Sequence, residues 1–177
     1  IVTYGFDPRD APLKMRGKHL SPEEFHAKLQ QVGVRDKSSD GEADSNTERV
    51  TDDSKETVLI DVRTHKEYMV GRFKGAVDPE LRTFAEFPAY LKSKADTLKG
   101  KTVLMYCTGG IRCEKASAYV KSCGVEDVSQ LAGGIHRYLE QFPDGGHFKG
   151  KNFVFDRRIA VASQNPTVVG RCVSCAT

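Results

Sequence analysis

The chain has 177 residues, of which 38% are hydrophobic and 29% are charged, and its net charge is +3. This composition fits a globular domain with extensions, and no apolar run approaches the roughly 20 residues that a membrane-spanning helix needs, so we expect no membrane partner. The five cysteines are an odd number, which argues against a pure disulfide framework and suits the reducing cytoplasm, where we expect the protein.

The amino-terminal third is expected to hold one helix and one acidic insertion. Residues 1–18 are predicted to be a linker that follows a further domain upstream of this chain. Ser21 is a typical N-cap with Pro22 at the first helical position, and the apolar spacing that follows predicts a helix to about Gly33. Residues 36–56 contain eight acidic and three basic residues and almost no apolar ones, so we expect a disordered surface insertion.

Strand and helix patterns alternate from residue 57 to residue 142. Short apolar runs predict buried strands over residues 57–62, 102–106 and 125–131. Helical spacing and glycine stops predict helices over about 65–69, 83–94, 112–123 and 135–142, the second with a bend near Pro88. The alternation indicates an α/β domain over residues 19–145, with a mainly parallel central sheet flanked by helices on both faces.

Residues 146–177 are expected to form a carboxy-terminal extension. Two runs, over residues 152–156 and 159–162, predict a small β-hairpin. Cys172 and Cys175 form a Cys-x-x-Cys pair, which is half of the four-ligand set that a structural zinc site requires. The sequence contains no second pair, so a zinc ion would need ligands from elsewhere.

The chemistry is predicted to lie in the loop that follows the strand over residues 102–106. Ligands bind beyond the carboxyl ends of the strands in an open parallel sheet, and Cys107 lies at such an end. The glycines after it let successive backbone N–H groups point inward, and Arg112 opens a helix with an electropositive N-terminus. These features should lower the pKa of the Cys107 thiol and stabilise an anion, unless Cys107 is only a buried structural cysteine. The predicted substrate-binding residues are Thr108, Gly109, Gly110, Ile111 and Cys113.

The pattern Cys107-x-x-Gly110-x-Arg112 resembles the active loop of rhodanese-family sulfurtransferases. Three further segments are similar to that family in the same order: Asp61-Val62-Arg63 with Glu67-Tyr68, Gly71-x-Phe73-x-Gly75-Ala76, and Leu131-x-Gly133-Gly134-Ile135. The resemblance implies the rhodanese fold, with Cys107 and Arg112 as catalytic residues. Two positions depart from the family pattern: Cys113 stands where serine or threonine is usual, and Arg72 where histidine is frequent. The related dual-specificity phosphatases have a loop one residue longer, which disfavours phosphatase activity.

A longer stretch resembles one subfamily, the tRNA uridine hydroxylases of the rhodanese superfamily. The similar segments are Cys107-Thr108-Gly109-Gly110-Ile111-Arg112-Cys113-Glu114-Lys115, Phe73-Lys74-Gly75-Ala76-Val77, Phe84-x-x-Phe87-Pro88 and Phe153-Val154-Phe155-Asp156-x-Arg158. This resemblance implies conversion of the wobble uridine of tRNA to 5-hydroxyuridine, with molecular oxygen as co-substrate. It also implies a domain before this chain and a cysteine-rich segment after it, which could hold zinc.

Three functions are compatible with these residues. In a hydroxylase, Cys107 is expected to attack C6 of the uracil ring and make C5 reactive toward oxygen. In a sulfurtransferase, Cys107 would carry a persulfide taken from a small donor such as thiosulfate. In a non-catalytic module, the domain would only bind a partner, although such modules usually lose this cysteine. Cys113 is either a resolving thiol or a small residue at the start of a helix.

The remaining polar candidates have structural and functional interpretations. Asp61 and Arg63 are expected to support the site, as a cap and as a salt bridge from Arg63 to Glu67. The acidic insertion has a net charge of −5, which leaves +8 for the rest of the chain. That excess favours an anionic substrate or nucleic acid, although scattered surface lysines give the same count. Candidates for contacts with RNA phosphates, or for ordinary solvated surface, are Lys115, Arg157 and Arg158.

Overall fold

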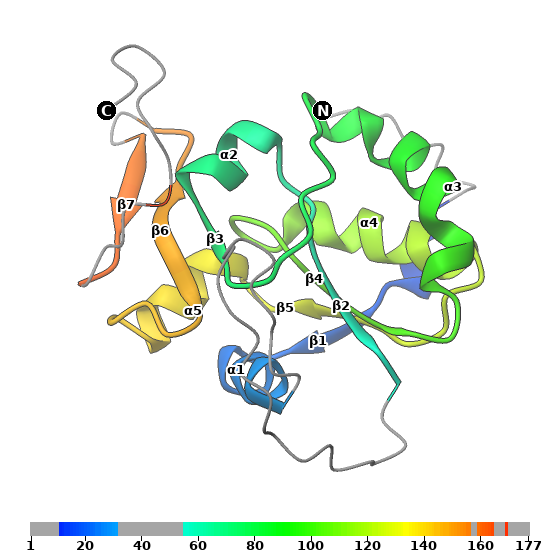
Figure 1. Ribbon diagram of the computed structural model, residues 1–177, viewed down its shortest axis with the longest axis horizontal. Helices are drawn as coiled ribbons and strands as arrows, with labels where there is room; N and C mark the ends of the chain where they lie inside the picture. Colours follow the sequence, from blue (N-terminus) through cyan, green and yellow to red (C-terminus); the bar gives the residue numbers. More distant parts are fainter. Residues whose placement is uncertain (1–10, 32–54, 157–158, 165–168, 170–177) are drawn as a thin grey trace, which may run out of the picture.

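A parallel sheet forms the centre of the computed structural model, which describes residues 11–31, 55–156, 159–164 and 169 (Figure 1). Its strands are β1 (Lys18–Leu20), β2 (Thr57–Asp61), β4 (Thr102–Tyr106) and β5 (Val128–Leu131), in the spatial order β1-β5-β4-β2. All three pairings are parallel. The predicted α/β class with a parallel sheet is therefore confirmed.

The central strand β4 is apolar because both of its faces are covered. Val103 and Met105 pack into one core cluster, and Leu104 and Tyr106 pack into another. Burial on both faces explains the continuous apolar run, which alternating strands of a half-exposed sheet do not show. The edge strand β1 was not predicted, because only the last of its three residues is buried. The expected strand over 125–131 begins only at Val128.

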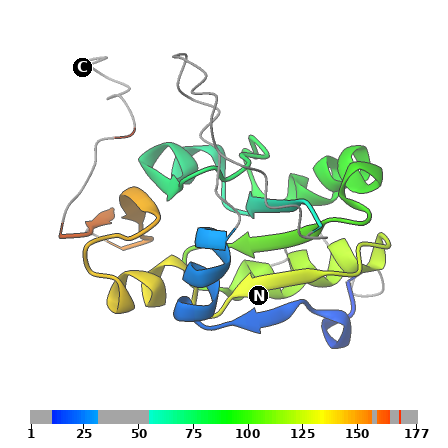
Figure 2. The same ribbon diagram turned by 60° about the horizontal axis from the view of Figure 1, so that its bottom comes forward.

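Helices cover both faces of the sheet (Figure 2). The cluster around Leu104 contains side chains of α1 (Pro22–Gln31) and α5 (Gly134–Gln141). The opposite cluster contains side chains of α3 (Phe87–Leu98) and α4 (Ile111–Ser122). Together with the short helix α2 (His65–Val70), these elements place the amino ends of α2, α4 and α5 near the carboxyl edge of the sheet.

The helix expected over residues 83–94 is corrected at both ends. A 3-10 turn, η2 (Phe84–Glu86), comes first, and α3 then runs to Leu98. Pro88 lies in the first turn of α3, where its missing N–H has no partner within the helix anyway, so it starts the helix and does not bend it. The buried side chain of Leu98 holds the last turn against the core.

A second, antiparallel sheet contains β3 (Gly71–Phe73), β6 (Phe148–Phe153) and β7 (Ala160–Ala162). The pairing of β6 with β7 confirms the expected hairpin. The strand β6 begins earlier than expected, however, and also pairs with β3, a strand that was not predicted. The close approach requires glycine at position 71, since a Cβ there would lie 2.3 Å from the carbonyl oxygen of Lys151.

Several predictions concern residues outside the described part of the chain. These are residues 1–10 of the linker, most of the acidic insertion, and Arg157, Arg158, Cys172 and Cys175. Among the helices that the structure describes, none has the length and apolar character needed to cross a membrane.

Candidate active site

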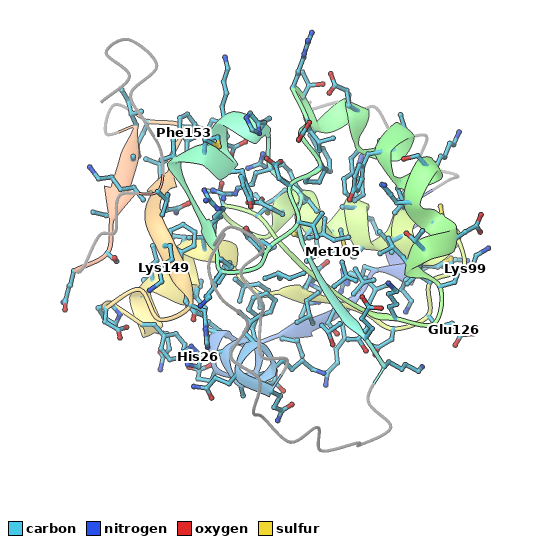
Figure 3. All side chains as sticks on the ribbon, viewed as in Figure 1. His26, Lys99, Met105, Glu126, Lys149 and Phe153 are labelled. Atoms are coloured by element: carbon cyan, nitrogen blue, oxygen red, sulfur yellow. The ribbon has the colours of Figure 1, made fainter. Side chains whose placement is uncertain are left out.

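The loop after β4 places Cys107 at the carboxyl edge of the parallel sheet. Figure 3 shows Met105 of this strand at the centre of the molecule, and Cys107 follows two residues later, with only 1% of its surface exposed. The neighbouring strand β2 ends at Asp61, which is in register with Tyr106. The helix α4 starts at Ile111, so the loop from Cys107 to Gly110 connects a buried strand directly to a helix N-terminus.

Hydrogen-bond donors surround the sulfur of Cys107. The backbone N–H of Gly110 donates to Sγ over 3.1 Å, and Gly110 reaches this position with a φ of 87°, in the left-handed region that favours glycine. The Cys113 thiol, the Arg112 charge and the backbone N–H groups of Cys113 and Arg112 also stabilise the thiolate. They outweigh burial and lower the pKa of Cys107 to about 6. The group is therefore a thiolate at neutral pH, as a nucleophile requires.

Cys113 lies beside Cys107 and has the opposite titration behaviour. Burial, followed by its hydrogen bond with the Cys107 sulfur, raises the pKa of Cys113 well above the ordinary value. Its thiol therefore stays protonated and donates to the Cys107 thiolate. The sequence predicted Cys113 as a resolving thiol or as a small residue, and neither prediction included its hydrogen bond to the Cys107 sulfur.

The Cys107 thiol is expected to titrate with a midpoint near pH 6, below the ordinary value of about 8.5. The thiolate is thus present above pH 6 and is lost as the pH falls through that value. Cys113→Ala removes the largest cause of the shift and should move the midpoint upward, whereas Cys113→Ser keeps a donor and should move it less. The ultraviolet absorbance difference between each protein and its Cys107→Ser counterpart measures this titration. An unchanged midpoint in Cys113→Ala would contradict the assignment.

Arg112 is held by Glu67 and Thr108. Its guanidinium donates to both carboxylate oxygens of Glu67, over 2.9 and 2.7 Å, and to the Thr108 hydroxyl over 3.1 Å. Burial raises the pKa of Glu67, but the hydrogen bond and charge of Arg112, with Thr64, lower it to about 2. The pair therefore stays ionised. Glu67 was missing from the predicted site, although it belongs to one of the family-like segments.

The supporting pair Asp61 and Arg63 is fully buried, but its expected salt bridge is wrong. Arg63 donates through Nε and Nη2 to the Asp61 carboxylate, over 2.9 and 2.7 Å, and not to Glu67. The Asp61 carboxylate also accepts the backbone N–H of Arg63. Glu67 has other partners, because it closes the capping box of α2 with Thr64 and binds Arg112.

The amino end of α5 is hydrogen-bonded to the loop that begins at Cys107. The backbone N–H groups of Ile135 and His136 donate to the carbonyl oxygens of Cys107 and Thr108, over 2.9 and 3.0 Å. Gly134 allows this approach, since a Cβ there would lie 2.4 Å from the Cys107 carbonyl oxygen. Its φ of 63° also lies in the left-handed region. The Gly-Gly pair of the sequence thus positions the loop.

Gly134→Ala is expected to destabilise the protein by about 1–3 kcal/mol and to displace the loop. The Cβ would meet backbone atoms, which cannot yield as a flexible side chain does. Gly109→Ala is the matched control, because a Cβ at position 109 meets nothing within 4 Å. Chemical denaturation measures the stability, and the Cys107 titration reports on the loop. Equal effects of the two substitutions would contradict this role of Gly134.

The rim of the site combines apolar and charged groups. Ile111 and Phe155 are 68% and 75% exposed, and the guanidinium carbon of Arg112 lies 5.6 Å from the centroid of the Phe155 ring. Gly109 has open space beside it. Within the described residues, no group of three or more histidine, cysteine or acidic side chains could hold a metal ion.

Comparisons with known proteins agree with this architecture. The family model of the Rhodanese-like domain matches residues 43–141. The chain is 48% identical over 183 residues to "Rhodanese-like domain-containing protein 6" of Arabidopsis thaliana, covering 99% of the chain and 29% of that protein. It is 43% identical over 162 residues to the "tRNA uridine(34) hydroxylase" of Brucella ovis, covering 91% of the chain and 45% of that protein. The chain thus spans less than half the length of these curated relatives.

Solved structures show the same fold at low identity. The solution structure of a rhodanese-like domain from Anabaena is 18% identical, with a TM-score of 0.51, covering 87% of this chain and 92% of that one. A Saccharomyces cerevisiae homologue of single-domain rhodanese and the Cdc25 phosphatase catalytic domain is 16% identical, with a TM-score of 0.50, covering 85% of this chain and 93% of that one.

Proposed function

Because this chain belongs to the rhodanese-like domain family, we propose that it forms the catalytic part of an enzyme that hydroxylates the wobble uridine of tRNA to 5-hydroxyuridine. The similarity to tRNA uridine(34) hydroxylases over 91% of the chain supports the substrate. The observation that carries the chemistry is the Cys107 sulfur, held as a thiolate by the loop N–H groups and the Cys113 thiol. The proposal includes a cytoplasmic location, where the tRNA substrate occurs.

In this proposal the Cys107 thiolate adds to C6 of the uracil ring. The S–C6 bond forms, the C5–C6 π electrons move toward the C4 carbonyl, and C5 becomes nucleophilic. C5 then forms a bond to one atom of molecular oxygen. Two external thiols supply the two electrons and two protons that break the O–O bond and release the second oxygen atom as water, and the thiols become a disulfide. Loss of the C5 proton and expulsion of the thiolate restore the ring as 5-hydroxyuridine.

The other loop residues prepare Cys107 for this step. The N–H groups and the Cys113 thiol keep the sulfur anionic before attack and accept it again as the leaving thiolate. Arg112 is fixed by Glu67 and Thr108, so its charge reaches the sulfur from a constant position. Since Glu67 balances that charge, the site suits a neutral ring better than a strongly anionic substrate.

Expression in bacteria that lack tRNA uridine(34) hydroxylase tests the proposed substrate. The gene that encodes this chain should restore 5-hydroxyuridine and its derivatives in tRNA, as measured by nucleoside mass spectrometry. Failure to restore them, with the protein folded and present, would contradict the proposal.

Sulfur transfer is the second candidate, and the buried thiolate favours it independently of RNA. Cys107 would attack the outer sulfur of thiosulfate, the S–S bond would break, and sulfite would leave with the bonding electron pair. The persulfide would sit among the same N–H donors. The pairing of Arg112 with Glu67 leaves less free positive charge for a dianion, so we rank this activity second.

A non-catalytic role ranks third, because Cys107 is intact and ionised. Zinc binding by Cys172 and Cys175 remains a prediction.

A further inference from the structure

Phe155 is an exposed aromatic side chain on the connection between β6 and β7. It is 75% exposed, and its ring packs edge-on against Phe153, with centroids 5.3 Å apart and planes at 79°. Phe153 ends β6 and therefore anchors the ring to the small sheet. The ring of Phe155 is therefore held in place on one edge and remains accessible to a ligand.

The ring of Phe155 lies at the rim of the active loop. The Arg112 guanidinium, which interacts electrostatically with the Cys107 thiolate, lies 5.6 Å from the ring centroid. Glu67 also binds that guanidinium. Ile111, the residue before Arg112, is also exposed. An exposed aromatic ring thus lies close to the loop that holds the buried Cys107.

The exposed face of β6, the strand that leads to Phe155, is basic. Burial alternates along β6, so Lys149, Lys151 and Phe153 share its exposed face. Figure 3 shows the labelled Lys149 and Phe153 along this strand. Arg72 of β3 is in register with Lys149 and adds a third cation to the same region. Cations that follow a strand toward exposed aromatics are typical of surfaces that bind single-stranded nucleic acid.

We propose that Phe155 is a specificity-determining residue that stacks on an unpaired base of the substrate RNA and holds it at the Cys107 loop. The proposal rests on the proposed function, because it assumes that the substrate is a base in an RNA loop. Aromatic side chains stack on splayed-out bases of single-stranded RNA. Lys149 and Lys151 both precede Phe155 along the chain, so they would contact phosphates on one side of the stacked base.

Four substitutions separate stacking from simple coverage of Arg112. Phe155→Tyr and Phe155→Trp keep an aromatic face and should keep most of the 5-hydroxyuridine made in complemented cells. Phe155→Ala and Phe155→Leu remove the face and should lower it roughly 5- to 150-fold, the usual effect of losing one base stack. Phe155→Leu is the decisive variant, since it keeps an apolar cover over Arg112. Wild-type activity in Phe155→Leu would overturn the proposal.

The Cys107 titration of Phe155→Leu shows whether the loop is intact. An unchanged midpoint with lost hydroxylation supports a role in holding the base. A midpoint that moves upward along with the loss would mean that Phe155 acts on the thiolate through Arg112, and would overturn the stacking role.

Fluorescence tests stacking without any turnover. The sequence contains no tryptophan, so Phe155→Trp introduces a single tryptophan at the rim of the site. Leu13→Trp is the control, since Leu13 is 50% exposed and its short helix η1 (Leu13–Met15), at the blue start of the described chain, lies far from the orange hairpin (Figures 1 and 2). Oligouridylate should quench the first tryptophan and not the second. Quenching would support stacking even if wild-type cells made no 5-hydroxyuridine, which would defeat only the proposed function. Equal responses of the two variants would overturn the stacking.

Discussion

Asp61→Ala is expected to lower the free energy of unfolding by about 3–5 kcal/mol, because it leaves a charge buried without its partner. Arg63 and Asp61 are both 0% exposed, and the Asp61 carboxylate accepts three side-chain hydrogen bonds and one backbone hydrogen bond from Arg63. Burial lowers the pKa of Arg63, but the charge and hydrogen bonds of Asp61, with smaller contributions from Tyr106 and Glu67, together outweigh burial and raise that pKa above its ordinary value, so the guanidinium stays ionised in the folded state. Without Asp61 that cation loses the one carboxylate with which it forms an ion pair among the described residues.

The matched control is the double substitution Asp61→Ala with Arg63→Met. It removes both charges and keeps an unbranched side chain in the core, so it should recover most of the lost stability. Chemical denaturation of both proteins and of the wild type measures the effect. A double variant as unstable as the single one would show that packing around these residues, and not the unpaired charge, dominates the loss.

The buried pair Asp61 and Arg63 also contacts residues next to the active loop. Arg63 also bonds to the carbonyl oxygen of Gly71, at the start of β3, and Asp61 contacts the ring hydroxyl of Tyr106, the residue before Cys107. Asp61 and Arg63 therefore act as positioning residues that join the ends of β2 and β4 to the small sheet. These contacts differ from the salt bridge expected from the spacing of Arg63 and Glu67.

Local sequence patterns predicted the central strands, the start of the first helix and the loop at Cys107. The apolar runs at β2 and β4, the proline at the start of α1 and the glycines around Cys107 each have a direct physical meaning, and the structure has these elements where they were expected. The ends of the helices were less predictable. The helix α3, for example, extends to Leu98 because that side chain is buried in the core, and the sequence of the helix alone does not indicate this burial.

Contacts between distant segments could not be predicted in the same way. Arg112 and Glu67 are 45 residues apart, and either residue had several acceptable partners in the sequence. The pairing of β3 with β6 depends on close backbone contacts at Gly71 and Gly150, which the local sequence pattern does not indicate. Phe155 was part of a recognised motif, but only the hairpin brings its ring to Arg112. The resemblance indicated which segments mattered, and the structure supplied their partners.

Cys107→Ser is expected to reduce 5-hydroxyuridine to the level of cells without the gene. A serine hydroxyl is protonated at neutral pH, so the N–H donors that stabilise the thiolate have no anion to bind. The substitution keeps nearly the same volume in a buried position, so the protein should remain folded. Cys123→Ser, at the far end of α4, is the matched control and should retain activity.

Nucleoside mass spectrometry of tRNA from bacteria that lack tRNA uridine(34) hydroxylase, and that carry either the wild-type gene or its Cys107→Ser variant, tests the central claim most directly. The account predicts 5-hydroxyuridine with the wild-type gene and with Cys123→Ser, and none with Cys107→Ser at equal protein levels. Undiminished 5-hydroxyuridine in the Cys107→Ser cells would contradict the assignment of Cys107 as the nucleophile.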